Sequence, residues 1–360
     1  MRRSWPIGFL ISFLLIFTFR PESSPQPGRR CQVPAATQEG APPDSAELAT
    51  GPSPTPPAAP VEPQIEETQP RARSAVLAGL LWALRHQNED GSWGDAPTTL
   101  GDRTIGRTGV TGFVLLALLG AGYSHLSRDE YDGIVVGPRV KKGISWLLTQ
   151  LREDGLFLSG YDDRFDQAIA ALALSDSYGM TASTWLKEPT ARALDALTRL
   201  QAADGSWGGS AATPWAILAL VSGENNELPY PNETRDRAFA YLRTQPHAAQ
   251  LEAREFLKDR SDPDALEGLA QAIANSPPHA DETDFEALYH QATGLFLYDG
   301  PEGVLWKKWA PAARDALIPA QNPDGSWNGG SESHRLVRTA LAEFTLQTCY
   351  RYGGSLTLGR

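Results

Sequence analysis

Three aspartates near the middle of the chain have the side chains and spacing of a metal site. Asp162, Asp163 and Asp166 stand in the string Asp162-Asp163-Arg164-Phe165-Asp166, and carboxylate oxygens are the ligands that hard divalent cations prefer. The same string opens an apolar run of helical spacing, where acids cap a helix and complement its dipole. We favour the capping role, and these three are the acids to mutate first.

His290 is a second candidate for acid–base chemistry. It follows Tyr289 in a segment that is apolar nearly all round, so we expect a buried side chain. Both a structural hydrogen bond and a polar role in a cavity stay open for it. The histidines, which are His86, His125, His247, His279, His290 and His334, do not have the H-x-x-x-H spacing of zinc sites. We therefore expect no metal and no cofactor.

Large aromatic residues recur in the apolar segments. Such rings can line a cavity that receives an isoprenoid or a carbocation, or they can pack only against one another. The candidates for an aromatic wall are Phe113, Tyr178, Trp215, Tyr289, Phe296 and Phe344.

A short motif, Q-x-x-D-G-S-W, separates the segments that carry these residues. Three copies end at Trp93, Trp207 and Trp327, and a degraded copy ends at Phe157. The last gap is about twice either of the others, which indicates a repeat in which one unit has lost its motif. The key positions of the four copies are Gln87, Gly91, Trp93, Gly155, Phe157, Gln201, Gly205, Trp207, Gln321, Gly325 and Trp327.

The motif has the chemistry of a helix stop. Its Asp-Gly pair predicts a tight turn in which glycine takes a positive φ. The glutamine amide can bond helix-end carbonyls that lack intrahelical partners. The tryptophan can pack over the turn and join one unit to the next. We therefore interpret the motif as structural.

Apolar residues at helical spacing precede and follow each copy. Polar helices are expected before the motifs, at 76–85, 140–151, 191–200 and 312–320. Helices apolar nearly all round are expected after them, at 108–120, 165–178, 215–221, 285–298 and 335–350. The stretches 235–243, 248–258 and 264–274 complete six helix pairs. Alternating runs of Val, Ile and Thr are missing, so the pattern predicts an all-α fold.

The motifs resemble the QW repeats of the squalene cyclase and protein prenyltransferase β-subunit superfamily, over roughly residues 72–352. The run from Trp306 to Trp327 also looks like the last unit of the bacterial proteins of this kind. The resemblance implies an α/α toroid, with the apolar helices in an inner ring around a central cavity and the polar ones in an outer ring. It also implies an isoprenoid or another hydrophobic ligand.

The chemical signatures of that superfamily are missing. The chain has no D-x-D-D acid, and the nearest string, Asp262-Pro263-Asp264, is better explained as a helix cap. Gln347 stands where a zinc-binding prenyltransferase would place an Asp before Cys349, and no Cys-Gly-Glu-Gln thioester string occurs. The D-D-x-x-D string at Asp162 matches a magnesium-diphosphate motif, but that motif belongs to a terpene synthase class of a different fold.

The N-terminal part differs in composition. The apolar run from Trp5 to Phe19 would be roughly 22 Å long as a helix, so residues 1–20 are expected to be a signal-anchor or signal peptide. Residues 21–71 hold 13 of the 28 prolines and are expected to be a disordered linker. The toroid would follow at 72–353, with a tail at 354–360. A membrane-anchored toroid outside the cytoplasm is expected, the alternative being an exported and cleaved protein.

Charge and motifs together limit the function. The net charge is −11, which argues against a nucleic-acid partner. We favour a non-catalytic toroid, tethered to a membrane, that binds a hydrophobic ligand or a protein partner. The alternative is an isoprenoid- or lipid-processing enzyme, similar to a terpene cyclase, that uses an unrecognised acid in the cavity.

Overall fold

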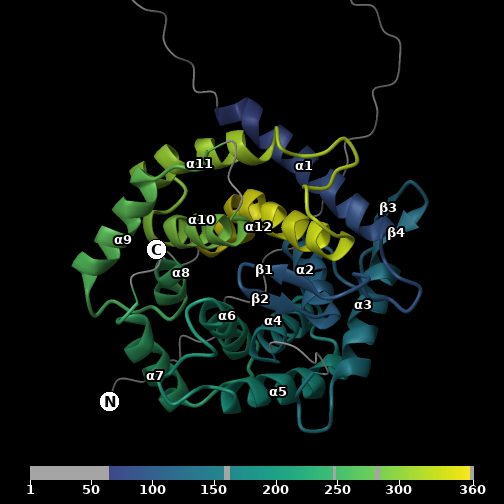
Figure 1. Cartoon of the computed structure of the whole chain (residues 1–360), viewed down its shortest axis with the longest axis horizontal. Coiled ribbons are helices and arrows are strands. Elements are labelled where there is room, and N and C mark those ends of the chain that lie inside the picture. The colour runs from purple at the N-terminus through teal and green to yellow at the C-terminus, as the bar shows by residue number, and fades with distance from the viewer. Residues whose placement is uncertain (1–64, 158–162, 246–248, 280–283, 357–360) are drawn as a thin grey trace, which may run out of the picture.

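Helices in two concentric rings form the fold (Figure 1). The computed structural model describes residues 65–157, 163–245, 249–279 and 284–356. Within these ranges the inner helices are α2 (Arg107–Gly120), α4 (Asp163–Thr181), α6 (Ala212–Asn225), α8 (Ala249–Phe256), α10 (Phe285–Asp299) and α12 (Glu332–Leu356). The outer helices are α1 (Ile65–Arg85), α3 (Val136–Gln150), α5 (Thr184–Arg199), α7 (Asn232–Leu242), α9 (Pro263–Asn275) and α11 (Val304–Leu317).

The inner ring is closed. Each inner helix packs on the next one along the chain, and α12 packs on α2 to complete the circle. Helix α1 also packs on α12, so the two ends of the helical part lie side by side. The expected six helix pairs of an all-α fold are thus present in the described part of the chain.

Composition explains why α2 lies in the inner ring and why helices with one charged face lie in the outer ring. In α2 every residue from Thr108 to Leu119 is buried, as expected of a helix packed on all sides. Glycine lets neighbouring helices approach closely there, since a Cβ on Gly112 would lie 2.7 Å from the Ile169 side chain of α4. The outer helices α3, α5, α9 and α11 bury one face, and their charged residues point outward.

Two small antiparallel hairpins were not expected from the sequence. Strands β1 (Thr98–Leu100) and β2 (Arg103–Ile105) pair with Thr98 opposite Ile105. Strands β3 (Glu130–Tyr131) and β4 (Ile134–Val135) form the second hairpin. These strands have two or three residues each, which is too short for a pattern of alternating burial to be recognised in the sequence.

The beginning of the ring differs from the expected boundary. Helix α1 starts at Ile65, so its first turns fall in the range expected to be linker. Pro70 lies inside this helix beyond its first turn, so the helix lacks one backbone hydrogen bond there. In the part of the chain that the structure describes, no helix is both long and apolar enough to cross a membrane. The run from Trp5 to Phe19 lies outside that part.

The Q-x-x-D-G-S-W segments form nearly identical turns, which we call the glutamine turns. In residues 201–207, Gln201 Nε2 donates to the carbonyl of Gly205 at 3.0 Å and to that of Thr234 in α7 at 2.9 Å. Trp207 Nε1 donates to the carbonyl of Leu197 in α5 at 2.7 Å. The turn therefore ends one outer helix and holds the next, rather than only capping the helix it follows.

Glycine is required at the centre of these turns. Gly205 has φ +92°, and a Cβ there would lie 2.2 Å from the carbonyl oxygen of Arg237 in α7. The left-handed conformation and the close approach both exclude a side chain. Gly91, Gly155 and Gly325 share the positive φ and the same approach to the next outer helix.

The degraded turn is completed by another residue. Leu151 stands where the other copies have glutamine, and Gln167 of α4 occupies its place. Gln167 Nε2 donates to the carbonyls of Gly155 and Ala193, each at 2.9 Å, and its Oε1 accepts from the Phe157 N–H at 3.0 Å. The bonding pattern of the repeat is thus kept although its sequence is not.

Candidate functional site at the centre of the ring

Aromatic side chains fill the middle of the inner ring. Trp215 of α6 stacks on Tyr289 of α10 with ring centres 5.0 Å apart, and Phe113 of α2 meets Trp215 edge-on at 5.3 Å. Phe344 of α12 lies 5.2 Å from Tyr289. Each of these four rings is at most 1% exposed. They form a packed cluster, which we call the aromatic centre, with edge-on and tilted contacts favourable for rings.

Four charged side chains lie beside the aromatic centre, three of them buried and the fourth, Arg103, half-buried. Glu286 of α10 accepts hydrogen bonds from Arg103 of β2 and, at 2.8 Å, from Trp215 Nε1. His290 Nδ1 pairs with Glu252 of α8, and its Nε2 lies 3.9 Å from Glu286. We call Arg103, Glu252, Glu286 and His290 the buried quartet.

The contacts within the quartet shift the pKa values of Glu286 and His290. Burial raises the pKa of Glu286, but the contact with His290 and the charge and hydrogen bonds of Arg103 outweigh it and lower that pKa to about 2. Burial lowers the pKa of His290, but Glu252 and Glu286 outweigh it and raise that pKa to about 9. Glu286 is therefore ionised and His290 protonated at neutral pH, and these two charges, which lie side by side, compensate each other.

The β1–β2 hairpin brings Arg103 to the centre. Its strands contact α2 and α12, and the guanidinium lies over the Phe165 ring of α4 at 4.3 Å while it pairs with Glu286. A cation placed between a ring face and a carboxylate is held by both. The hairpin thus covers one end of the aromatic centre.

Of the three aspartates predicted as candidates, the structure describes the side chain of Asp166 alone. Asp162 lies outside them, and Asp163 begins α4 but its side chain is not described. Asp166 is fully buried, and its Oδ2 accepts the Gly106 N–H at 3.0 Å, at the start of α2. Its carboxylate thus meets the N-terminus of the neighbouring helix, where an anion is favoured.

The remaining aromatic candidates lie elsewhere. Phe296 is buried between the inner and outer rings of helices, where it meets Trp306 of α11 edge-on with ring centres 5.0 Å apart. Tyr178 is half-buried near the C-terminal end of α4 and packs against the core. Of the six candidates, the structure therefore brings Phe113, Trp215, Tyr289 and Phe344 together, with His290 beside them.

Sequence analysis missed Arg103, Glu252 and Glu286. The available signal was a carboxylate within an inner helix that is otherwise apolar, as at Glu286, because such a group must be buried and therefore paired. The same signal marks Glu343 of α12. This residue is 1% exposed, its Oε1 has no hydrogen-bond partner among the described residues, and burial raises its pKa well above the usual 4.5.

The chemistry open to the centre is limited by its packing. A protonated imidazole between two carboxylates is a possible proton donor, but the rings around it leave it 4% exposed. Within the described ranges, no three His, Cys, Asp or Glu side chains are grouped as ligands for a metal ion.

Solved structures with this fold include enzymes of different chemistry. The type II terpene cyclase MstE from Scytonema is 16% identical over 78% of this chain and 98% of its own, with a TM-score of 0.56. An unsaturated glucuronyl hydrolase specific for heparin is 14% identical over 81% and 98%, with a TM-score of 0.54. An inactive α-1,6-mannanase variant from a Salegentibacter species is 10% identical over 78% and 99%, with a TM-score of 0.53.

These similarities define the class of fold. The chain is an α/α toroid of the kind found in terpene cyclases and in some toroidal hydrolases. At such identities the likeness concerns the fold, since function resides in the site. No family model and no curated protein matches the sequence.

Proposed function

We propose that this chain is a non-catalytic binding module, built on a terpene-cyclase-like toroid, that takes its hydrophobic ligand or protein partner outside the centre of the ring. One observation carries the proposal: Phe113, Trp215, Tyr289 and Phe344 fill the place where the fold would hold a substrate. Binding pockets for drug-sized ligands have volumes of about 300–1,000 Å³. Side chains packed as in a protein interior leave no such space.

The first test is a search for turnover and for bound lipid. The purified full chain is incubated with squalene and with geranylgeranyl diphosphate, and lipid extracts are analysed by mass spectrometry. We expect no cyclised product, and any lipid that co-purifies is expected to bind outside the aromatic centre. Turnover that disappears in Glu286→Gln and persists in the exposed control Glu89→Gln would overturn the proposal.

That overturning result would favour a second function, an isoprenoid-processing enzyme whose acid belongs to the buried quartet. A variant of MstE has been solved with geranylgeranyl dihydroxybenzoate as its substrate. The aromatic centre and the protonated His290 between two glutamates are the observations that favour this alternative here. It requires the β1–β2 hairpin to move, because Arg103 covers Glu286.

We further propose that the run from Trp5 to Phe19 tethers the toroid to a membrane, with the toroid outside the cytoplasm. The length and apolar character of this run support the proposal. Carbonate extraction of membranes should leave the full chain in the pellet and release a chain that begins at Ile65. Intact mass then separates the tether from an exported and cleaved protein, because only the tether retains Met1–Arg20.

A further inference from the structure

The exposed apolar side chains of this protein gather at one end of the ring. Among the described residues, the large apolar side chains that are exposed are Leu126, Val135, Met180, Trp185 and Val304. All five lie at the passage from an inner helix to the next outer helix, namely from α2 to α3, from α4 to α5 and from α10 to α11. Single exposed apolar residues are common on protein surfaces, but a gathering at one end marks an interaction surface.

Four of these side chains belong to two connections that contact each other, and we call them the apolar rim: Leu126, Val135, Met180 and Trp185. The His125 ring meets the Trp185 ring edge-on with centres 5.4 Å apart, and His125 Nε2 lies 3.0 Å from the Ser183 hydroxyl. These contacts join the α2–α3 connection to the α4–α5 connection. The rim is therefore one surface rather than a set of scattered residues.

The inner helices end on the same side of the ring. Arg351, near the end of α12, pairs with Asp176 near the end of α4 at 2.9 Å. Gly120, at the end of α2, lies so close to α12 that a Cβ on it would be 2.4 Å from Gln347 Oε1. The connections that carry the apolar rim therefore leave the inner ring at the end where α12 also finishes.

Helix α1 begins at this same end. Gly79 of α1 lies against Glu343 of α12. Arg73, which is closer to the start of α1, lies near Tyr350, which is closer to the end of α12. The two helices are therefore antiparallel, and the chain that precedes α1 joins the toroid at the end that carries the rim. The proposed tether belongs to this preceding part of the chain.

Charged side chains near the rim have both signs. Arg128, Lys141 and Lys187 are exposed, and so are Glu130 and Glu188. Charge of one sign therefore does not select the partner of this surface. Apolar contact must supply most of the binding free energy.

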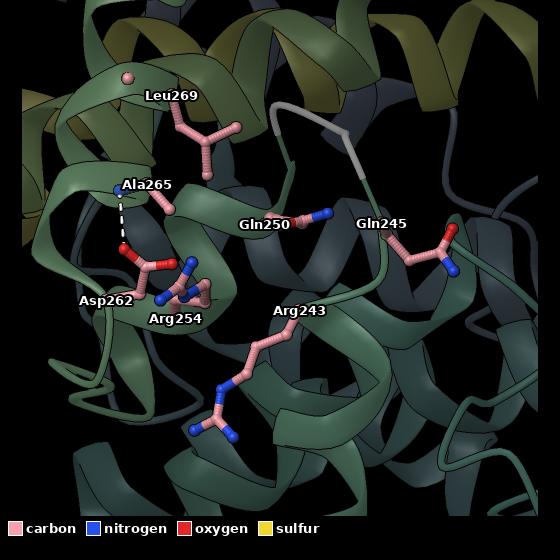
Figure 2. Close-up of a pocket in the computed structure, with 8 residues that line it drawn as sticks. Arg243, Gln245, Gln250, Arg254, Asp262, Ala265 and Leu269 are labelled. Carbon is pink, nitrogen blue, oxygen red and sulfur yellow. Dashed lines mark hydrogen bonds between the residues drawn. The ribbon is translucent and has the colours of Figure 1, made fainter.

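A separate hollow of about 390 Å³, between α7, α8 and α9, has a different lining (Figure 2). Most of its lining side chains are polar, and the charges of Arg243 and Arg254 are balanced by those of Asp259 and Asp262. The hollow therefore offers little apolar surface and no net charge, and it is not part of the rim.

We propose that the apolar rim lies against a lipid bilayer, with its side chains inserted at the level of the headgroups. Tryptophan is favoured at that level, because its ring has an apolar body and a polar N–H. The bilayer is the one reached by the tether proposed above, on which this inference rests. A tether makes even a weak surface contact effective, because it turns the contact into an intramolecular one.

Fluorescence quenching of the full chain tests the proposal. The chain is reconstituted in phosphatidylcholine vesicles whose acyl chains carry bromine, which quenches tryptophans that reach the lipid. Trp185 is the exposed tryptophan among the described residues, so Trp185→Phe should lose part of the quenching. The control Trp146→Phe should lose none, because Trp146 is buried and lies beside Arg107 at the other end of α2. Unchanged quenching in Trp185→Phe would overturn the proposal.

Trp5→Phe separates the rim from the tether. Trp5 opens the apolar run, so this variant should lose the share of the quenching that the tether contributes. A loss in Trp5→Phe without a loss in Trp185→Phe would support the tether and refute the rim. A loss in Trp185→Phe alone would support the rim and refute the tether.

Leu126→Glu places a charge in the rim. Leu126 is 63% exposed, so the melting temperature should not change. The quenching assigned to Trp185 should fall, because a carboxylate resists entry into lipid. Thr99→Glu is the control and should leave the quenching unchanged, since Thr99 is exposed in the β1–β2 hairpin at the opposite end of the ring.

Two outcomes of this comparison contradict the proposal. One is equal quenching in Leu126→Glu and in the wild type. The other is a dimer, seen by lipid-free sedimentation of the full chain, that Leu126→Glu dissociates. The rim would then bind a second copy of this chain rather than a bilayer.

Discussion

At the scale of single residues, buried carboxyl groups make the stability of this protein depend on pH. Burial raises the pKa of Glu343 in the fold well above the usual 4.5, so its carboxyl keeps its proton to higher pH there than in the unfolded chain. The contribution of Glu343 to folding stability is therefore present at low pH. It is lost as the pH rises above the pKa of this group in the unfolded chain. Glu286 has the opposite sign, because its lowered pKa of about 2 gives a contribution that is lost in acid.

Glu343→Gln should stabilise the protein at neutral pH. Each pH unit above 4.5, up to the raised pKa, costs the wild type about 1.4 kcal/mol, and glutamine removes that cost. Urea unfolding at pH 4 and pH 8 should show a gain for the variant only at pH 8. The exposed control Glu89→Gln should show no such difference. An equal effect at both pH values would mean that Glu343 is ionised in the fold.

The imidazole of His290 should titrate at an unusually high pH. Its raised pKa means that its contribution to stability is complete below the usual 6.5 and is lost as the pH rises through about 9. Proton NMR of the imidazole signals should find one midpoint near 9, absent in His290→Asn. In Glu252→Gln that midpoint should move down, because the paired charge is gone. A midpoint near 6.5 for the signal that His290→Asn removes would refute this arrangement of charges.

At the scale of elements, the glutamine turns join each unit to the next. Gln87, Gln201 and Gln321 each bond the glycine carbonyl of their own turn and a carbonyl in another outer helix. Gln167 makes the same two bonds from an inner helix. All four turns of this chain therefore keep the same two amide-to-carbonyl bonds, although one of them has lost the glutamine of the motif.

Gln167→Leu should destabilise the protein at least as much as Gln201→Leu, because Gln167 makes three hydrogen bonds and Gln201 makes two. Each substitution removes the amide donor from the glycine carbonyl of the turn and from a carbonyl in the next outer helix. Gln167→Leu also leaves the Phe157 N–H without its acceptor, and an unsatisfied group costs about 1–3 kcal/mol. Chemical denaturation of both variants measures the comparison. Leu151→Gln is the matched rescue: in a Gln167→Leu background it puts glutamine where the other copies have it, and it should recover part of the lost stability. A negligible effect of Gln167→Leu would show that the degraded turn does not need this amide.

At the scale of the whole molecule, α1 closes the outer ring. Gln321 Nε2 donates to the Ala75 carbonyl at 2.7 Å, and Gly325 approaches the Ala78 carbonyl. Leu80, Trp82 and Leu84 of α1 are buried in the same core as the inner helices. The last repeat therefore depends on the first, unlike the ends of an open solenoid.

Truncations test this closure. A chain that begins at Ile65 keeps α1 and should melt at the temperature of the full chain. A chain that begins at Gln87 lacks α1, exposes apolar surface of α12 and should show no cooperative unfolding by circular dichroism. Cooperative unfolding of the shorter chain at an unchanged temperature would show that α1 is dispensable.

The sequence by itself determined the helical class, the six pairs and the place of the turns. These features are periodic or local: a helix period, an Asp-Gly pair, a repeated Trp. For that reason the predicted start of α10 agrees with the observed start at Phe285, and the predicted end of α7 lies within one residue of the observed end at Leu242. The start of α1 was missed because Pro70 resembles linker composition.

Only the tertiary structure decided what occupies the centre. Arg103 and Glu286, or Glu252 and His290, meet across long stretches of chain, and no local pattern encodes such a meeting. The replacement of Leu151 by Gln167 is of the same kind. Side chains that share a core are selected by packing between helices, so their partners become visible only once the ring is closed.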